Sequence, residues 1–157
     1  MPNGQSGDDM PTNLPPLEPL LALNPNAIFA LYVAVNAVLL LILSVLTVRA
    51  RIATGTTLGD GGKPRMLQTT RAFGNASEYI PIGLIMLYAL VVVGAPTWLL
   101  HVQGATLTLG RVFHALGLHA VAGRSTGRVL GMLLTWASLL IGIVGAISVA
   151  AGVGLPA

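Results

Sequence analysis

Three polar residues at helical spacing stand inside a stretch of the chain that is otherwise apolar enough to cross a membrane. Arg71, Asn75 and Glu78 are spaced i, i+4 and i+7, so on a helix they share one face. Glu78 is the only acidic residue between Asp60 and the C-terminus. A carboxylate in hydrocarbon is costly unless it is paired or faces a polar cavity. This face is therefore where we expect the function to lie.

A second polar pair is predicted at a matching depth. Arg111 and His114 are spaced i, i+3 and so share a face of a later segment. At about 1.5 Å per residue, Glu78 lies roughly 10 Å inward of Arg71. Arg111 lies roughly 14 Å inward of the C-terminal end of its own segment, which is on the same side of the membrane. An ion pair between Glu78 and Arg111 would remove the cost of two lone charges in lipid. We state this pair as a hypothesis.

Composition places the chain in a membrane. Of its 157 residues, 54% are hydrophobic and only 8% are charged, whereas a soluble domain carries about a quarter charged residues. The segments lack the period-two alternation of barrel strands, and each exceeds the roughly 20 residues that a helix needs to span a bilayer. The four predicted helices cover about residues 27–48, 71–93, 98–121 and 129–151. We therefore predict an all-α integral membrane protein, a bundle of four transmembrane helices.

The rest of the chain indicates one membrane domain and its orientation. Residues 1–25 are polar and are expected to form a flexible tail before a single domain at 26–152. The basic residues gather in two of the loops, so the positive-inside rule places loops 49–70 and 120–128 in the cytoplasm and both termini outside. We expect the membrane to be a bacterial inner membrane. The net charge of +3 thus reflects topology, and we expect no nucleic-acid partner. The chain has no cysteine, so any thiol must come from a bound substrate.

Two motifs resemble those of the MAPEG family (membrane-associated proteins in eicosanoid and glutathione metabolism). They are Arg71-x-x-x-Asn75-x-x-Glu78-Tyr79-x-Pro81 on the second predicted helix and Arg111-Val-Phe-His114 on the third, and the resemblance covers about residues 27–151. It implies a homotrimer that binds glutathione between protomers, near the cytoplasmic face. Carried over by position, the tripeptide would be bound by Arg71, Asn75, Glu78, Tyr79, Arg111 and His114. Glu78 would either meet its ammonium group or hold Arg111 in place.

The resemblance also implies a catalytic arginine near the start of the fourth helix. Arg124 is the first candidate and Arg128 the second. A nearby cation lowers the pKa of a thiol and raises the thiolate fraction. With glutathione as co-substrate and no metal, the thiolate would attack a hydrophobic small-molecule electrophile, or reduce a hydroperoxide, that arrives from the membrane lipids. One departure is Leu118, where some family members have a tyrosine that contacts glutathione.

The same residues are compatible with two other functions. Four helices with one membrane carboxylate also describe small proton-coupled exporters of hydrophobic compounds. A non-catalytic scaffold could keep the same polar cluster for packing alone. Asn36 could hydrogen-bond across helices, and its role is open. A row of small residues on the fourth helix is typical of helix packing; it comprises Thr135, Ser138, Gly142 and Gly145.

Overall fold

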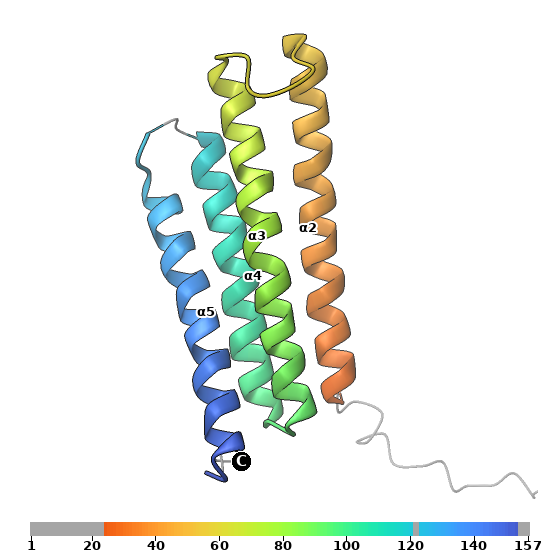
Figure 1. Cartoon of the computed structure of the whole chain (residues 1–157), viewed down its shortest axis with the longest axis vertical. Coiled ribbons are helices and arrows are strands. Elements are labelled where there is room, and N and C mark those ends of the chain that lie inside the picture. The colour runs from red at the N-terminus through yellow and green to blue at the C-terminus, as the bar shows by residue number, and fades with distance from the viewer. Residues whose placement is uncertain (1–23, 121–122, 154–157) are drawn as a thin grey trace, which may run out of the picture.

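The computed structural model describes residues 24–120 and 123–153, and these form a bundle of four α-helices (Figure 1). The helices are α2 (Pro25–Thr54), α3 (Pro64–Val92), α4 (Thr97–Ala120) and α5 (Thr126–Ala150). The predicted all-helical class and the order of four helices are confirmed. The flexible tail that was predicted for residues 1–25 lies, up to residue 23, outside the described residues.

Three helices are long and apolar enough to cross a membrane, judged by length and composition. These are α2, α3 and α5. The 24-residue α4 is long enough, but Gln103, Arg111 and His114 make it more polar. All three of these side chains are buried inside the bundle, so the neighbouring helices shield them. The structure is therefore that of a helical membrane protein in which these three polar side chains of α4 face the interior of the bundle.

The loops are shorter than the sequence predicted. α2 continues to Thr54 and α3 begins at Pro64, so the predicted loop 49–70 shrinks to residues 55–63. The prediction followed the apolar run, whereas the helix ends where the backbone turns. Gly55 ends α2 in the left-handed conformation at φ 62°, and its N–H bonds back to the last turn. The ring of Pro64 presets the φ angle of a first helical residue. The predicted loop 120–128 likewise ends earlier, because Ser125 caps α5 at Thr126.

The two loops with basic residues lie at the same end of the bundle. Figure 1 shows the α2–α3 and α4–α5 connections at the top and the α3–α4 turn at the bottom. In the α2–α3 loop Gly59, Gly61 and Gly62 all adopt positive φ, a conformation that glycine tolerates and other residues rarely adopt. This end of the bundle is called the loop end below.

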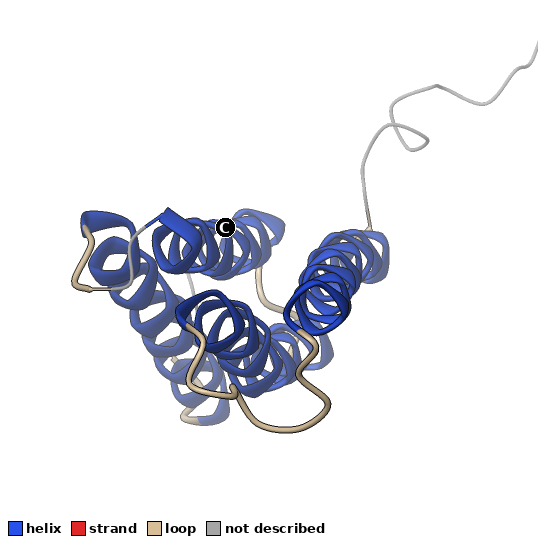
Figure 2. Ribbon diagram, turned by 90° about the horizontal axis from the view of Figure 1, so that it is seen from above, coloured by secondary structure: helices blue, strands red, loops and turns tan. Residues whose placement is uncertain are grey.

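Contacts between the helices are uneven. α4 packs against α2, α3 and α5, whereas α2 and α5 do not touch in the described part of the chain (Figure 2). The α4–α5 seam is held close by glycine: a Cβ on Gly131 would lie 2.4 Å from the backbone nitrogen of His114. The predicted packing row on α5 is confirmed, since its four small residues are buried. The close seam brings the start of α5 against the polar part of α4.

Asn36 has a structural partner. Its side chain is fully buried and its amide nitrogen donates to Thr108 Oγ1 on α4 at 2.9 Å and to the carbonyl oxygen of Tyr32 at 2.9 Å. Asn36, whose role the sequence left open, thus forms an interhelical hydrogen bond between α2 and α4, well away from the loop end.

Candidate functional site

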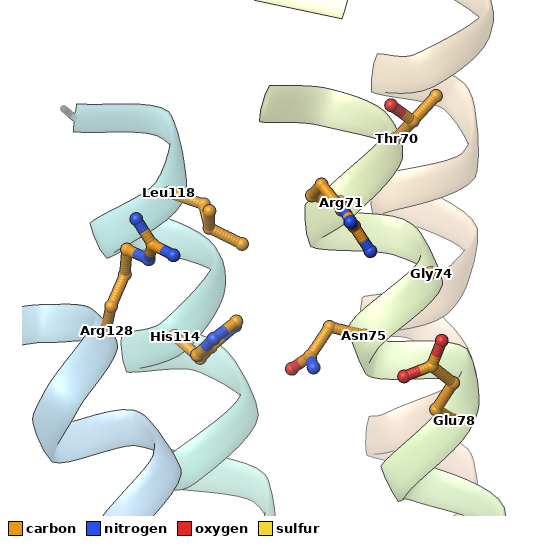
Figure 3. A pocket seen from close by; sticks show the side chains of 8 residues that line it. All are labelled: Thr70, Arg71, Gly74, Asn75, Glu78, His114, Leu118 and Arg128. Atoms are coloured by element: carbon orange, nitrogen blue, oxygen red, sulfur yellow. The ribbon is translucent and has the colours of Figure 1, made fainter. Parts of the chain in front are cut away.

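A polar pocket of about 330 Å³ opens between α3, α4 and α5 near the loop end (Figure 3). Arg71, Asn75 and Glu78 line it from α3, and Arg128 lines it from α5. The remaining lining residues are Thr70, Gly74, His114 and Leu118. The pocket thus brings together four of the six residues that were predicted to bind glutathione, namely Arg71, Asn75, Glu78 and His114.

The spacing of α3 explains why its polar residues reach the pocket. Ala72, Ala76 and Ile80 are buried on the opposite side of the helix, in a cluster with Leu43 of α2. Packing of that apolar stripe turns the i, i+4, i+7 face outward. Arg71 and Glu78 are exposed there, and Asn75 is half-buried. The sequence prediction of a shared polar face is confirmed.

Arg111 is not in this pocket. It is 1% exposed, and its Nη1 donates to Asn75 Oδ1 at 2.5 Å while its Nε and Nη2 donate to Thr135 Oγ1 at 2.9 and 2.6 Å. The predicted ion pair between Glu78 and Arg111 is therefore wrong. Counting residues gave both groups a similar depth but did not give the direction in which each side chain points. Asn75 extends toward α4, whereas Glu78 lies farther from it (Figure 3).

Tyr79 contacts the same buried cation. The guanidinium carbon of Arg111 lies 5.1 Å from the centre of the Tyr79 ring, a cation–π distance. Tyr79 and Arg111 both lie outside the lining of the polar pocket. In this single chain, two of the six residues predicted to bind glutathione, Tyr79 and Arg111, thus lie behind the lining residue Asn75 and do not line the pocket themselves.

An apolar pocket of about 280 Å³ adjoins the polar one. Four apolar side chains of α5 line it, namely Val129, Met132, Leu133 and Trp136. Leu133 and Trp136 are 54% and 51% exposed, so this wall faces outward from the bundle. His114 and Arg128 line both pockets and form the boundary between them. One side chain can therefore contact a polar ligand and an apolar ligand at once.

The two candidate catalytic arginines are placed differently. Arg124 lines only the apolar pocket, together with Ser125. Arg128 lines both pockets, and its Nη1 donates to the carbonyl oxygen of Gly123 at 2.6 Å. That bond ties the side chain back to the α4–α5 loop and restrains its position. The geometry thus favours the second sequence candidate over the first.

A third pocket, of about 470 Å³, lies at the loop end beside the polar one. Arg71, Leu118 and Arg128 line both. Lys63 and Asp60 of the α2–α3 loop line only the outer pocket. A water-soluble anion that approaches from the loop end would meet these cations on its way to the polar pocket. Leu118, the position where a tyrosine was missing, leaves an apolar side chain at this boundary.

Two features of the site were not predicted from the sequence. Thr135 was assigned to helix packing, yet its hydroxyl accepts two hydrogen bonds from Arg111. The apolar wall of α5 was predicted only to be part of a membrane-spanning helix. Met132 and Trp136 are one helical turn apart and so share a face. Apolar residues that line a pocket have the same spacing as those that face lipid, so the sequence does not distinguish the two.

Comparison with known proteins identifies the family of the chain. The MAPEG family model matches residues 29–148. The chain is 38% identical over 112 residues to "Inner membrane protein YecN" of Escherichia coli (strain K12), covering 71% of this chain and 84% of the relative. The protein of the same name from Escherichia coli O6:H1 (strain CFT073) matches with the same identity and coverage. From the match over all four helices, we conclude that the chain belongs to the MAPEG family.

Proposed function

We propose that this protein is a membrane-bound, glutathione-dependent transferase or peroxidase that acts on lipophilic electrophiles or hydroperoxides. The observation that carries the proposal is the junction of a polar and an apolar pocket at His114 and Arg128. Such a reaction needs a water-soluble thiol and a bilayer-soluble partner to meet, and each pocket suits one of them. Both volumes lie near the lower end of the range for small-molecule sites.

The polar pocket suits the charges of glutathione, which carries two carboxylates and one ammonium group. The Arg71 guanidinium can bind a carboxylate through two parallel hydrogen bonds. Glu78 can accept from the ammonium group. Of the two roles considered for Glu78, the ligand contact is the one supported here, because Arg111 is bonded to Asn75 and Thr135 instead.

Arg128 is our candidate for the residue that activates the thiol. Its positive charge would stabilise the thiolate, whose sulfur attacks the electrophilic carbon of the lipophile. A carbon–sulfur bond then forms as the bond to the leaving group breaks, and the thiol proton goes to solvent. With a hydroperoxide, two glutathione molecules are oxidised to the disulfide, while the hydroperoxide is reduced to an alcohol and water.

The exposure of Arg71 and Glu78 supports a homotrimer. Both charged side chains are exposed on the single chain, on a helix that is long and apolar enough to span the bilayer. A neighbouring copy that covers this face would shield the two charges from lipid and narrow the glutathione site. The relative's name, inner membrane protein, supports the same location for this chain. Placing the loop end in the cytoplasm would let glutathione reach the polar pocket directly.

Calorimetric titration of glutathione into the detergent-purified protein tests the proposal. We expect saturable binding that Arg71→Ala and Glu78→Gln each weaken by at least about tenfold, a loss typical of one charged hydrogen bond. Arg65→Ala is the matched control, because Arg65 is an exposed arginine of α3 that lines none of the three pockets. Absence of binding at millimolar glutathione, with the fold intact, would contradict the proposal. Proton-driven dye efflux that Glu78→Gln abolishes would then favour the exporter.

A further inference from the structure

The buried cation of Arg111 is satisfied by neutral oxygens. Its guanidinium donates to Asn75 on α3 and to Thr135 and Gly131 on α5. A buried charge without a carboxylate partner needs several well-placed acceptors. Arg111 therefore depends on the hydroxyl of Thr135, which accepts from both its Nε and its Nη2. These contacts tie three helices together directly behind the polar pocket.

The Thr135 hydroxyl is itself held in one orientation. It donates to the carbonyl oxygen of Gly131 at 2.8 Å, so both of its lone pairs are directed to Arg111. The side chain is 0% exposed, and so no water competes for these bonds. Two bonds from the same guanidinium to one oxygen fix the plane of the guanidinium as well as its position.

The fixed guanidinium determines which end of the Asn75 amide faces the pocket. Arg111 Nη1 donates to Asn75 Oδ1, so the amide oxygen is turned to Arg111. The amide nitrogen is then the group that Asn75 has left to offer to a ligand in the polar pocket. A pocket that presents this N–H donor favours a carboxylate or carbonyl oxygen and disfavours another donor.

We propose that Thr135 is a positioning residue for the thiol site: through Arg111 it holds the Asn75 amide with its N–H donors toward the ligand. The proposal rests on the proposed function for the identity of the ligand, but not for the positioning itself. Thr135 does not line the polar pocket, so any effect on binding has to pass through another residue.

Glutathione affinity in a double-mutant cycle is the first test. Thr135→Val keeps the side-chain shape and removes the acceptor, and we expect it to weaken binding about tenfold, as for other charged hydrogen bonds. Thr135→Ser should retain the parent affinity. In an Asn75→Ala background, Thr135→Val should have no further effect, because the residue through which it acts is gone. Equal losses in both backgrounds, or no loss in either, would overturn the proposal.

Ser138→Ala is the matched control. Ser138 lies one turn further along α5, is 0% exposed, and donates to the carbonyl oxygen of Gln103 at 2.9 Å. Its removal takes away a buried interhelical hydrogen bond of the same helix without touching Arg111. We expect a lower melting temperature and an unchanged glutathione affinity. A tenfold loss of affinity in this variant would show that general loosening, not positioning, explains the Thr135 effect.

Side-chain amide NMR separates this proposal from the proposed function. In protein labelled with ¹⁵N at asparagine, the Nδ2 signals of Asn75 are those that Asn75→Ala removes. We expect Thr135→Val to shift or broaden them, and Thr135→Ser and Ser138→Ala to leave them in place. If these NMR shifts are observed but the parent protein does not bind glutathione, glutathione is rejected as the ligand and the positioning role of Thr135 is retained. Signals that do not respond to Thr135→Val would reject the positioning.

Discussion

Arg111 and Arg128 are both close to His114, yet they belong to two different regions of the molecule. Arg111 lies in a buried polar core, where Asn75 and Thr135 accept its hydrogen bonds. Arg128 lies at the boundary of two pockets, and its side chain donates a hydrogen bond to the loop carbonyl of Gly123. A cation whose donors are all used by the protein stabilises structure, whereas one that borders a cavity has donors left for a ligand. The number of satisfied donors thus separates supporting residues from candidate reactive ones.

The largest effect that tests this comparison is expected from Arg111→Ala. Truncating a large, fully buried side chain leaves a cavity and two unpaired acceptors, so we expect a loss of about 3 kcal/mol in the free energy of unfolding. Arg71→Ala, at an exposed position, should change it by less than about 0.5 kcal/mol. Thermal unfolding in detergent measures both. Similar melting temperatures for the two variants would break the distinction between core and pocket.

Arg128→Leu should have the next largest effect, and on turnover instead of stability. Loss of the charge beside the sulfur should lower the rate of thiol transfer by about 100-fold, the size expected for removing one electrostatic stabiliser of the reacting group. Arg124→Leu, which alters only the apolar pocket, should cost less than about threefold. Rates with a lipophilic model electrophile in detergent check this. A reversed order would return Arg124 to the catalytic role.

Gly131→Ala tests the seam that joins the two regions. The added Cβ would lie 2.4 Å from the backbone nitrogen of His114, so the backbones of α4 and α5 must separate. We expect a loss of about 2 kcal/mol in the free energy of unfolding, as for other overpacked interiors. Gly123→Ala is the control, because nothing lies within 4 Å of its Cβ position. Equal stability of the two variants, measured by chemical unfolding, would show that the seam yields easily.

Trp136→Ala should have the smallest effect, confined to the apolar pocket. We expect affinity for the lipophilic substrate to fall about fivefold and glutathione affinity to stay unchanged, since only part of an exposed ring contacts the ligand. Leu140→Ala, one turn further along the same exposed face and outside the pocket, is the control. Separate titrations of the two ligands measure this. A parallel loss of glutathione affinity would mean that the pockets are not independent.

Much of this fold was predictable, because long apolar runs have few alternatives in a membrane. The face that carries Arg71, Asn75 and Glu78 was also predictable, since residue spacing gives the angular position on one helix. Spacing within one helix does not give the rotation of that helix against its neighbours. For that reason the Glu78–Arg111 pair was wrong. The sequence, which placed Arg124 first, could not show that Arg128 is the arginine at the boundary of the two pockets.

The role of Thr135 was hidden for a related reason. A threonine between small residues on an apolar helix is typical of packing, and its burial bears that out. Only the position of the facing helix shows that the same hydroxyl accepts two hydrogen bonds from a cation. Packing and positioning use the same residue type at the same spacing, so one sequence cannot separate them.

The polarity of α4 has a consequence for biosynthesis. A single arginine at the centre of a helix opposes its partition into lipid by about 3 kcal/mol, and α4 carries Gln103 and His114 in addition to Arg111. The acceptors that satisfy Arg111 are on α3 and α5, and α5 is synthesised after α4. We therefore expect stable integration of α4 to follow the synthesis of α5, with the α4–α5 hairpin as the unit of insertion.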